Sequence, residues 1–253
     1  MNELLARLVD ITYELVGVLI PGLIASVFLV LLLIAVQPLL AGFFGGGFCF
    51  DLRHAWTWLN SSTKDGTITF IAVLVGWYLL GQVLLSFSKY RVVPDARSEK
   101  SSSRRVLRAL TFRIPRSPDS YDPKLEPLFK AVATKFNAPE VQLEWRQFYP
   151  VVRSYLAEHL KKSMITLYQN KYTLHRSITT ASTVAFWLSI LTCIGAGIGA
   201  ICGITVNWDL LVGILVGSFL IAWSFSASFM LHWQLFGDSV VTEAYSFLYG
   251  PQK

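Results

Sequence analysis

The sequence predicts an all-α integral membrane protein, with four transmembrane helices in two hairpins and a central cytoplasmic helical domain. Three observations predict this fold class. Hydrophobic residues make up 53% of the chain and charged residues only 15%, whereas about 25% of a soluble domain is charged. The apolar residues form four long runs, each able to cross a hydrocarbon core of about 30 Å. A polar segment, 89–176, separates the first two runs from the last two.

The distribution of charge predicts the orientation. Segment 89–176 holds 18 Lys and Arg against 8 Asp and Glu, whereas the loop 42–66 carries two charges of each sign. Basic loops remain on the cytoplasmic side of a membrane. We therefore expect segment 89–176 and both termini in the cytoplasm and the loop 42–66 outside.

The first hairpin is expected in residues 1–90, with spans at about 11–40 and 67–88. The first nine residues have leucines on one helical face and predict an amphipathic lead-in at the inner surface. Pro21 predicts a bend in the first span, because proline removes a backbone hydrogen bond.

Two polar residues lie in or near these spans. Glu14 is expected at the interface, paired with a basic residue of the central segment; the alternative is a functional intramembrane carboxylate. Gln82 is the one amide well inside the second span. It is expected to bond to another helix, contributing on the order of 1 kcal/mol.

The cytoplasmic domain is expected in residues 91–176. It opens with a linker containing Pro94 and four serines. A denser basic stretch follows, which contains Arg104, Arg105, Arg108, Arg113 and Arg116. Basic side chains beside a membrane span bind anionic lipid headgroups, at about 1 kcal/mol each. Lipid contact or simple topology signalling is favoured here over a nucleic-acid or nucleotide site, although arginine binds phosphate in any of these settings.

Helices are expected in the rest of this domain. Asp122-Pro123 predicts a helix start and Asn137-Ala138-Pro139 its end. A second helix is expected from about Glu140, with a kink or restart at Pro150. Because no Gly or Pro lies between residues 151 and 193, a continuous helix is expected to run into the third span.

The second hairpin is expected in residues 177–236, with spans at about 178–204 and 210–234, followed by a cytoplasmic tail, 237–253. Only Asn207, Trp208 and Asp209 lie between these spans, which predicts a tight turn. The spans carry glycines at a spacing of four, which are Gly195, Gly199, Gly203, Gly213 and Gly217. Such glycines allow helices to approach closely. Packing within the hairpin is favoured, and an interface between copies is the alternative.

Catalytic patterns are absent from the sequence. The four histidines are scattered, the three cysteines form no paired motif, and neither a zinc signature nor a nucleophile elbow occurs. The spans also lack the carboxylate clusters that hold a divalent metal. We therefore expect no enzyme, no metal and no cofactor.

Two short patterns carry a resemblance to a known group. The first pattern is Tyr13-Glu14-Leu15-Val16-Gly17 with Ile20-Pro21-Gly22, and the second is Tyr168-Gln169-x-x-Tyr172 before Arg176. They resemble sequences of uncharacterised small four-span proteins of bacterial inner membranes, which are found among antiphage defence genes. The likeness covers about a fifth of the chain. The resemblance implies a membrane effector that responds to a cytoplasmic signal, and it transfers no catalytic residue.

Two functions remain open from the sequence. The favoured one is a non-enzymatic, multi-pass inner-membrane effector that forms a homo-oligomer or pore-like assembly in contact with anionic lipids. The alternative is a membrane scaffold or regulatory subunit that recruits a soluble cytoplasmic protein.

Overall fold

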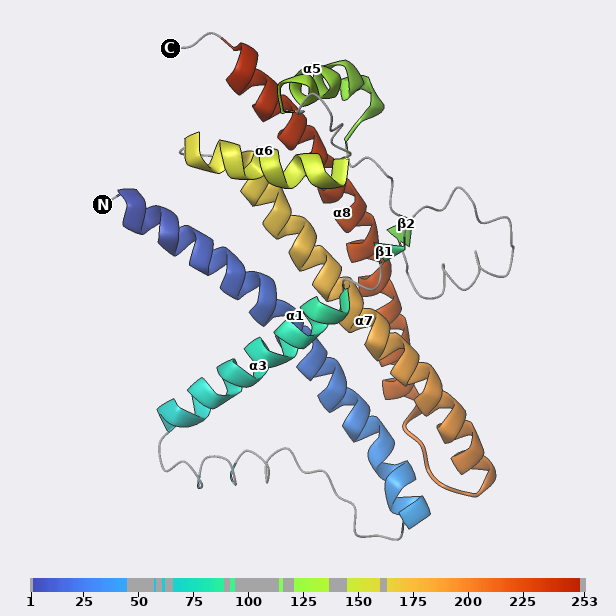
Figure 1. Cartoon of the computed structure of the whole chain (residues 1–253). Coiled ribbons are helices and arrows are strands. Elements are labelled where there is room, and N and C mark those ends of the chain that lie inside the picture. The colour runs from blue at the N-terminus through green and yellow to red at the C-terminus, as the bar shows by residue number, and fades with distance from the viewer. Residues whose placement is uncertain are drawn as a thin grey trace. The chain divides into compact units, whose positions relative to one another are not determined.

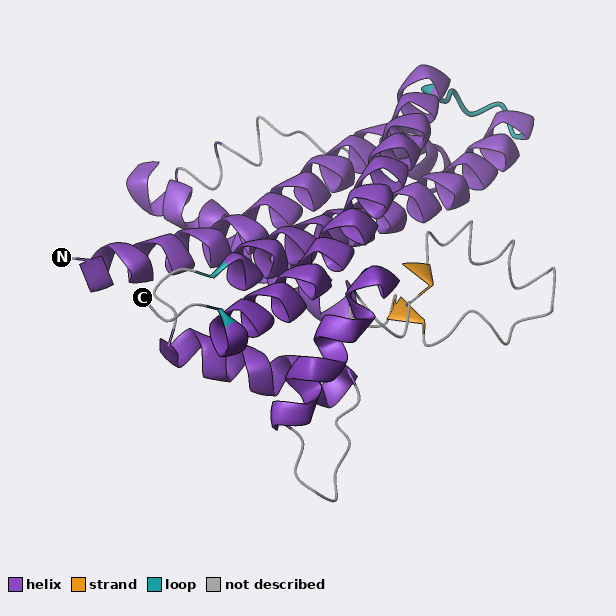
Figure 2. Cartoon of the chain, turned by 90° about the horizontal axis from the view of Figure 1, so that it is seen from above, coloured by secondary structure: helices purple, strands orange, loops and turns teal. Residues whose placement is uncertain are grey.

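The computed structural model describes residues 2–44, 57, 61, 66–88, 92–93, 114–115, 121–136, 145–159 and 163–250, and in the first helix it describes side chains from Gly17 onward. Helices account for nearly all of this part of the chain (Figures 1 and 2). They are α1 (Asn2–Phe44), α3 (Gly66–Ser88), the short 3₁₀ helix η2 (Pro123–Leu125), α5 (Glu126–Phe136), α6 (Trp145–His159), α7 (Met164–Ile201) and α8 (Trp208–Tyr249).

Four helices are long and apolar enough to cross a membrane, which confirms that prediction. These apolar helical segments are Gly17–Phe43, Gly66–Ser88, Met164–Ile201 and Trp208–Tyr249. At about 1.5 Å per residue, α7 and α8 are each about twice as long as a hydrocarbon core is thick. We therefore take their uncharged parts, 177–201 and 210–234, as the membrane-spanning segments.

The chain divides into two compact units. Unit 1 comprises Met1–Arg91 and Arg176–Ser226, and unit 2 comprises Val92–His175 and Ala227–Lys253. The helices α7 and α8 contribute residues to both units, because the divisions at Arg176 and Ser226 fall inside them.

Unit 1 has a narrow core and an apolar exterior. In α1, Phe28, Leu32, Ala35 and Leu39 recur at helical spacing and are buried against small and branched residues of α7 and α8. Of the 29 large hydrophobic side chains that the structure exposes, 25 belong to unit 1. A soluble protein rarely exposes such a surface, whereas a membrane protein covers it with lipid.

The turn from α7 to α8 is built around a glycine in the left-handed region. Gly203 has a φ of +77°. The N–H of Ile204 donates to the Gly199 carbonyl at 2.9 Å, and the N–H of Gly203 donates to the Ala200 carbonyl at 3.1 Å. This pair of bonds is a Schellman motif, which ends the helix and satisfies its last carbonyls. Gly203 therefore ends α7, which corrects the prediction that it forms part of a packing ridge.

The turn is also longer than predicted. It spans residues 202–207, whereas three residues from Asn207 to Asp209 were expected. Asn207 caps the next helix, since its side-chain oxygen accepts from the N–H of Leu210 at 3.2 Å. Trp208 and Asp209 consequently form the first turn of α8.

Unit 2 has an aromatic core that four helices share. Phe148, Val152 and Leu156 of α6 are buried at helical spacing, together with Tyr172 of α7 and Phe236 of α8. Residues 237–253 were expected to form a cytoplasmic tail that lies on the membrane surface or on the cytoplasmic helices. Up to Tyr249 these residues continue α8, and they pack on α5 and α6 by supplying Val240, Val241 and Ala244 to this core.

The ends of α5 follow the sequence prediction, and α6 lacks the predicted restart at Pro150. The carboxylate of Asp122 accepts from the N–H of Lys124 at 2.9 Å and caps the 3₁₀ turn that leads into α5. Helix α5 ends at Phe136, as predicted. Helix α6 is described over Trp145–His159 and continues through Pro150 without a restart; the start expected near Glu140 lies outside the described residues.

The predicted continuous helix from residue 151 into the third span is wrong. Helix α6 ends at His159, and α7 begins at Met164. The Ser163 hydroxyl accepts from the N–H of Ile165 at 3.1 Å and caps the new helix. The Glu243 carboxylate of α8 accepts from the Ser163 hydroxyl and from the N–H of Met164, both at 2.7 Å. These hydrogen bonds cap the start of α7 at a place where the sequence has no glycine or proline.

A short strand pair belongs to unit 2. Strands β1 (Val92–Val93) and β2 (Ile114–Pro115) pair in parallel, with Val92 opposite Ile114 (Figure 2). The residues of β1 fall in the segment predicted to be a linker, so that prediction is corrected at these two positions.

Candidate functional site

The closest contact between helices in unit 1 is the crossing of α1 and α3 (Figure 1). A Cβ atom on Gly22 would overlap the backbone carbonyl of Trp77, and a Cβ atom on Gly81 would overlap that of Val18. The two contacts are reciprocal and four residues apart on each helix, so the helices run antiparallel at the crossing. Glycine permits this approach because it has no side chain.

Beyond the crossing, α3 has few contacts with the rest of unit 1. Only Thr69, Gly81, Leu84 and Ser88 are buried among its 23 residues, and the helix diverges from α1 toward its N-terminal end (Figure 1). Helix α1 instead packs its later turns against α7 and α8. Helix α3 is therefore held closely at its crossing with α1 and is largely exposed elsewhere, apart from Thr69.

The exposed side of α3 carries three polar residues at a spacing of four. The Gln82 amide donates to the Tyr78 hydroxyl at 2.9 Å, and the Ser86 hydroxyl donates to the Gln82 carbonyl at 3.0 Å. At about 100° per residue, Gln82 lies about 100° around the helix from Gly81 and about 160° from Leu84. We call Tyr78, Gln82 and Ser86 the polar stripe. The expected bond from Gln82 to another helix is replaced by a bond within α3.

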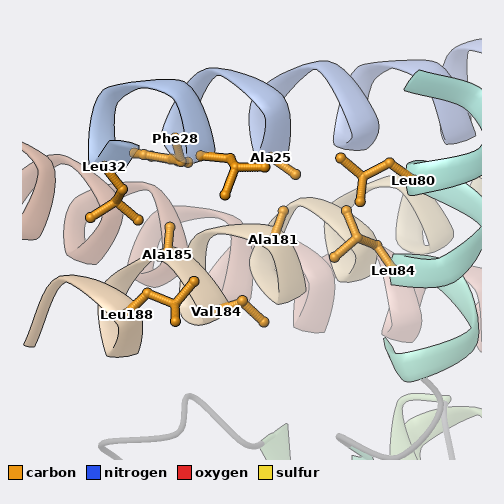
Figure 3. Close-up of a pocket in the computed structure, with 10 residues that line it drawn as sticks. Ala25, Phe28, Leu32, Leu80, Leu84, Ala181, Val184, Ala185 and Leu188 are labelled. Carbon is orange, nitrogen blue, oxygen red and sulfur yellow. The ribbon is translucent and has the colours of Figure 1, made fainter. Parts of the chain in front are cut away.

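An apolar cleft of about 130 Å³ lies between α1, α3 and α7 (Figure 3). Every side chain in its wall is hydrocarbon. The lining residues are Ala25, Phe28, Leu29, Leu32, Leu80, Leu84, Ala181, Val184, Ala185 and Leu188. Binding sites for polar ligands contain a few fixed polar groups. This wall offers none, so the cleft fits part of a lipid acyl chain rather than a reacting substrate.

The glycines of α7 and α8 have different surroundings. At Gly195, Gly213 and Gly217 no atom of the described residues lies within 4 Å of the position that a Cβ would occupy. At Gly199 a Cβ would lie 2.5 Å from the side chain of Leu39 in α1. The favoured prediction, that these glycines bring α7 and α8 together, is therefore wrong at the three open positions. An interface between copies remains a prediction for them.

Three of the six buried serine and threonine hydroxyls of α7 have hydrogen bonds to their own helix. Thr180, Thr183 and Ser189 each donate to the carbonyl four residues earlier, at 2.7 to 2.8 Å. Such bonds satisfy a hydroxyl inside an apolar environment. Within the described part of the chain, the buried Ser182 hydroxyl has no hydrogen-bond partner.

Two histidines of unit 2 stack between α7 and α8. The ring centroids of His175 and His232 are 4.6 Å apart, and the rings are nearly parallel at 23°. Nδ1 of His232 lies 2.8 Å from the Ser228 carbonyl. Because a carbonyl only accepts, this nitrogen carries the proton and donates. The Ser228 hydroxyl lies 3.4 Å from Nε2 of His175.

The two histidines join α7 to α8 within unit 2 by ring stacking. His175 precedes the membrane-spanning segment of α7, and burial, followed by the nearby His232 and Lys171, lowers the pKa of His175 to about 4. His175 is therefore neutral at pH 7. Among the described residues no group of three or more His, Cys, Asp or Glu side chains could hold a metal ion.

A second ionisable contact in unit 2 joins α8 to the start of η2. The Asp238 carboxylate accepts from the backbone N–H of Asp122 at 2.7 Å. Burial raises the pKa of Asp238, the hydrogen bond from Asp122 opposes the shift, and the charge of Asp122 adds to it. Asp238 lies beyond the membrane-spanning segment of α8.

Some predicted site residues lie outside the described part of the chain. These are the basic residues Arg104, Arg105, Arg108, Arg113 and Arg116, and the side chain of Glu14. Contact with anionic lipid, the alternative of nucleic acid, and the interfacial role of Glu14 therefore stay predictions.

Two contacts were missed in the sequence although a signal existed for each. Gly22 and Gly81 were assigned no joint role, yet a glycine near one end of each of two neighbouring antiparallel spans could have suggested a close crossing. His175 lies 26 residues before the end of α7, and His232 lies 24 residues after the start of α8. Because residues at similar distances from the turn face each other in an antiparallel helix pair, these counts could have predicted that the two histidines lie close together.

Comparisons with protein-family models, with curated proteins and with solved structures gave no match. We therefore infer function from the residues and their geometry.

Proposed function

We propose that the chain is a non-enzymatic, multi-pass membrane effector whose copies assemble into a pore-like homo-oligomer. Its four apolar helices cross a bacterial inner membrane as two hairpins, with both termini and the central segment in the cytoplasm. The exposed apolar surface of unit 1 supports its location in lipid. The excess of Lys and Arg in segment 89–176 supports the orientation.

The observation that carries the assembly is the open space at Gly195, Gly213 and Gly217. Small residues permit close packing between helices in lipid, where the hydrophobic effect no longer drives association. At these three positions the part of the chain that the structure describes makes no such contact. A second copy would fill the open faces of α7 and α8.

A conducting path would also need more than one copy. The segments 17–43, 66–88, 177–207 and 210–237 contain no Asp, Glu, Lys or Arg. Three of the six buried serine and threonine hydroxyls of α7 bond to their own backbone. Polar faces contributed by several copies would therefore line the path.

The trigger is proposed to act on unit 2. This unit has its own aromatic core, formed by α5, α6 and parts of α7 and α8. Because α7 and α8 are unbroken helices that contribute to both units, a change in unit 2 can alter them. The resemblance of Tyr13–Gly17 and of the segment before Arg176 to bacterial defence-associated membrane proteins supports a role in antiphage defence.

Mass measurement in detergent and ion flux in liposomes test this proposal together. The wild-type protein should have a mass of several chains and should release a trapped ion. Gly213→Leu combined with Gly217→Leu should abolish both properties and leave the helices folded. The matched control is Val212→Leu with Val216→Leu, which changes exposed residues of the same helix and should change neither property.

A strict monomer without ion flux would overturn the effector proposal. In that case the alternative, a scaffold or regulatory subunit for a soluble cytoplasmic protein, would account for unit 2. Co-purification of one stoichiometric soluble protein with the wild-type monomer would be the expected result of that alternative.

A further inference from the structure

The polar stripe on α3 is placed unfavourably for a single chain in lipid. Tyr78 and Ser86 are exposed and Gln82 is half-buried, and none of the three is among the buried residues of α3. Gln82 is six residues before the end of α3, or about 9 Å along the axis. It therefore lies inside the inner half of a bilayer, where polar groups lack water.

The bonds within α3 satisfy the stripe only in part. In the described part of the chain, the Gln82 side chain makes one hydrogen bond, from Nε2 to the Tyr78 hydroxyl. A glutamine amide can donate twice and accept twice. Its carbonyl oxygen Oε1 and one N–H remain available on the outward side of the helix.

A second copy of this chain supplies the complementary group at the correct depth. All copies in one membrane insert with the same orientation, so their Gln82 side chains lie at the same level. Around a symmetry axis along the membrane normal, each amide can donate to the amide oxygen of the next copy. The arrangement works for any number of copies, because one amide is both donor and acceptor.

The attachment of α3 also suits this contact. Its outward side is not covered by α1 or by the core of unit 1, and its exposed apolar residues flank the polar stripe. Val75 and Leu79 are among them. A largely exposed helix can pack against its equivalents without disturbing the α1, α7 and α8 core.

We propose that the polar stripe of α3 is the homotypic contact between copies and lines the axis of the assembly. The inference rests on the proposed homo-oligomer and names the surface that forms its centre. The chemistry required of the partner is an uncharged amide and hydroxyl surface at the same membrane depth.

Disulfide cross-linking in native membranes tests the surface. In a chain with its three cysteines replaced by serine, single cysteines are placed by Gln82→Cys and Ser86→Cys. The matched controls are Val83→Cys and Phe87→Cys, which lie one residue further along α3, about 100° around the helix, and are also exposed. An oxidant should yield covalent dimers at positions 82 and 86 and few at the controls.

A second measurement avoids the cysteines. Gln82→Leu keeps the outward side chain large and apolar, so the fold should not change. Self-association, measured by energy transfer between labelled copies at decreasing protein-to-lipid ratio, should weaken by about 3- to 20-fold. Val83→Leu is the control and should have no effect.

The outcomes separate the two proposals. Equal cross-linking at all four positions would overturn the polar stripe as the contact surface. Absence of cross-linking in a protein of oligomeric mass would also overturn it and leave the proposed assembly intact, with the stripe facing lipid or another protein. A monomeric mass in membranes would overturn both.

Discussion

Units 1 and 2 solve helix packing in opposite ways. Unit 1 brings helices together by removing side chains, at Gly22 and Gly81, and leaves its large apolar residues outside. Unit 2 fills its interior with large rings such as Phe148 and Phe236 and exposes few apolar residues. The difference shows that the described parts of the two units have surfaces of different polarity, and that the apolar surface of unit 1 is suited to lipid.

The comparison predicts that unit 2 loses stability when a buried side chain is shortened. Phe148 is fully buried and contacts Phe129, Phe136 and Trp145. Phe148→Ala should destabilise unit 2 by about 3 to 5 kcal/mol, because the deletion leaves a cavity. Hydrogen exchange of the α6 amides measures the loss. Val151→Ala, at an exposed position of the same helix, should have a small effect, and equal effects would contradict an aromatic core in unit 2.

Unit 1 should lose stability when a side chain is added at the helix crossing. Gly81→Leu places a side chain against the backbone of Val18, and overpacking of this kind costs up to about 3 kcal/mol. Thermal unfolding in detergent should show a lower midpoint. The control is Gly76→Leu on the same helix, where no atom lies within 4 Å of the Cβ position. If both variants unfold together, the crossing does not hold α3 in place.

A smaller effect should distinguish the glycines of α7 by conformation. Gly203→Ala forces a residue with a Cβ into a left-handed conformation and should cost about 1 to 2 kcal/mol. Gly197→Ala, outside the proposed interface, should be neutral or stabilising by up to about 1 kcal/mol, because alanine favours helices and the described residues leave the position open. Thermal midpoints of the two variants check the order, and a reversed order would be inconsistent with the Schellman turn.

The smallest effect concerns pH and unit 2. Burial raises the pKa of Asp238 above its ordinary value of 3.8, so the folded state favours the protonated form. Its stabilising contribution is present below about pH 4 and is lost as the pH rises through the folded-state pKa. Thermal midpoints between pH 4 and 7 should show this slope in the wild type and a reduced slope in Asp238→Asn. An unchanged slope would mean that other groups titrate.

Much of the helical structure was predictable, because its signals are local. Apolar run length predicted the four long helices, and Asp122-Pro123 predicted the start that leads to α5. The break between α6 and α7 was not predictable. It depends on Glu243, which is 80 residues away from Ser163 in sequence, and periodicity in a window does not detect a distant carboxylate.

The candidate site was less predictable than the fold. Spacing identified Gly199 and Gly203 as a ridge, yet one faces Leu39 and the other ends the helix. Spacing cannot distinguish a packing glycine from a capping glycine, since both replace a side chain with hydrogen. Gln82 was identified as polar within a span, but the side of α3 on which it lies became clear only with the crossing at Gly81.

The central claim of the proposed function is that the apolar spans of unit 1 are embedded in the bilayer and that helices α5 and α6 of unit 2 lie in the cytoplasm. Single cysteines in a chain without native cysteines test it, with a membrane-impermeant maleimide added to sealed vesicles of either orientation. Leu191→Cys and Val75→Cys, which are exposed in unit 1, should remain unlabelled in both orientations. Glu158→Cys, exposed in unit 2, should react only when the cytoplasmic side faces outward. Labelling of Leu191→Cys as fast as Glu158→Cys, or labelling of Glu158→Cys from the external side, would contradict the account.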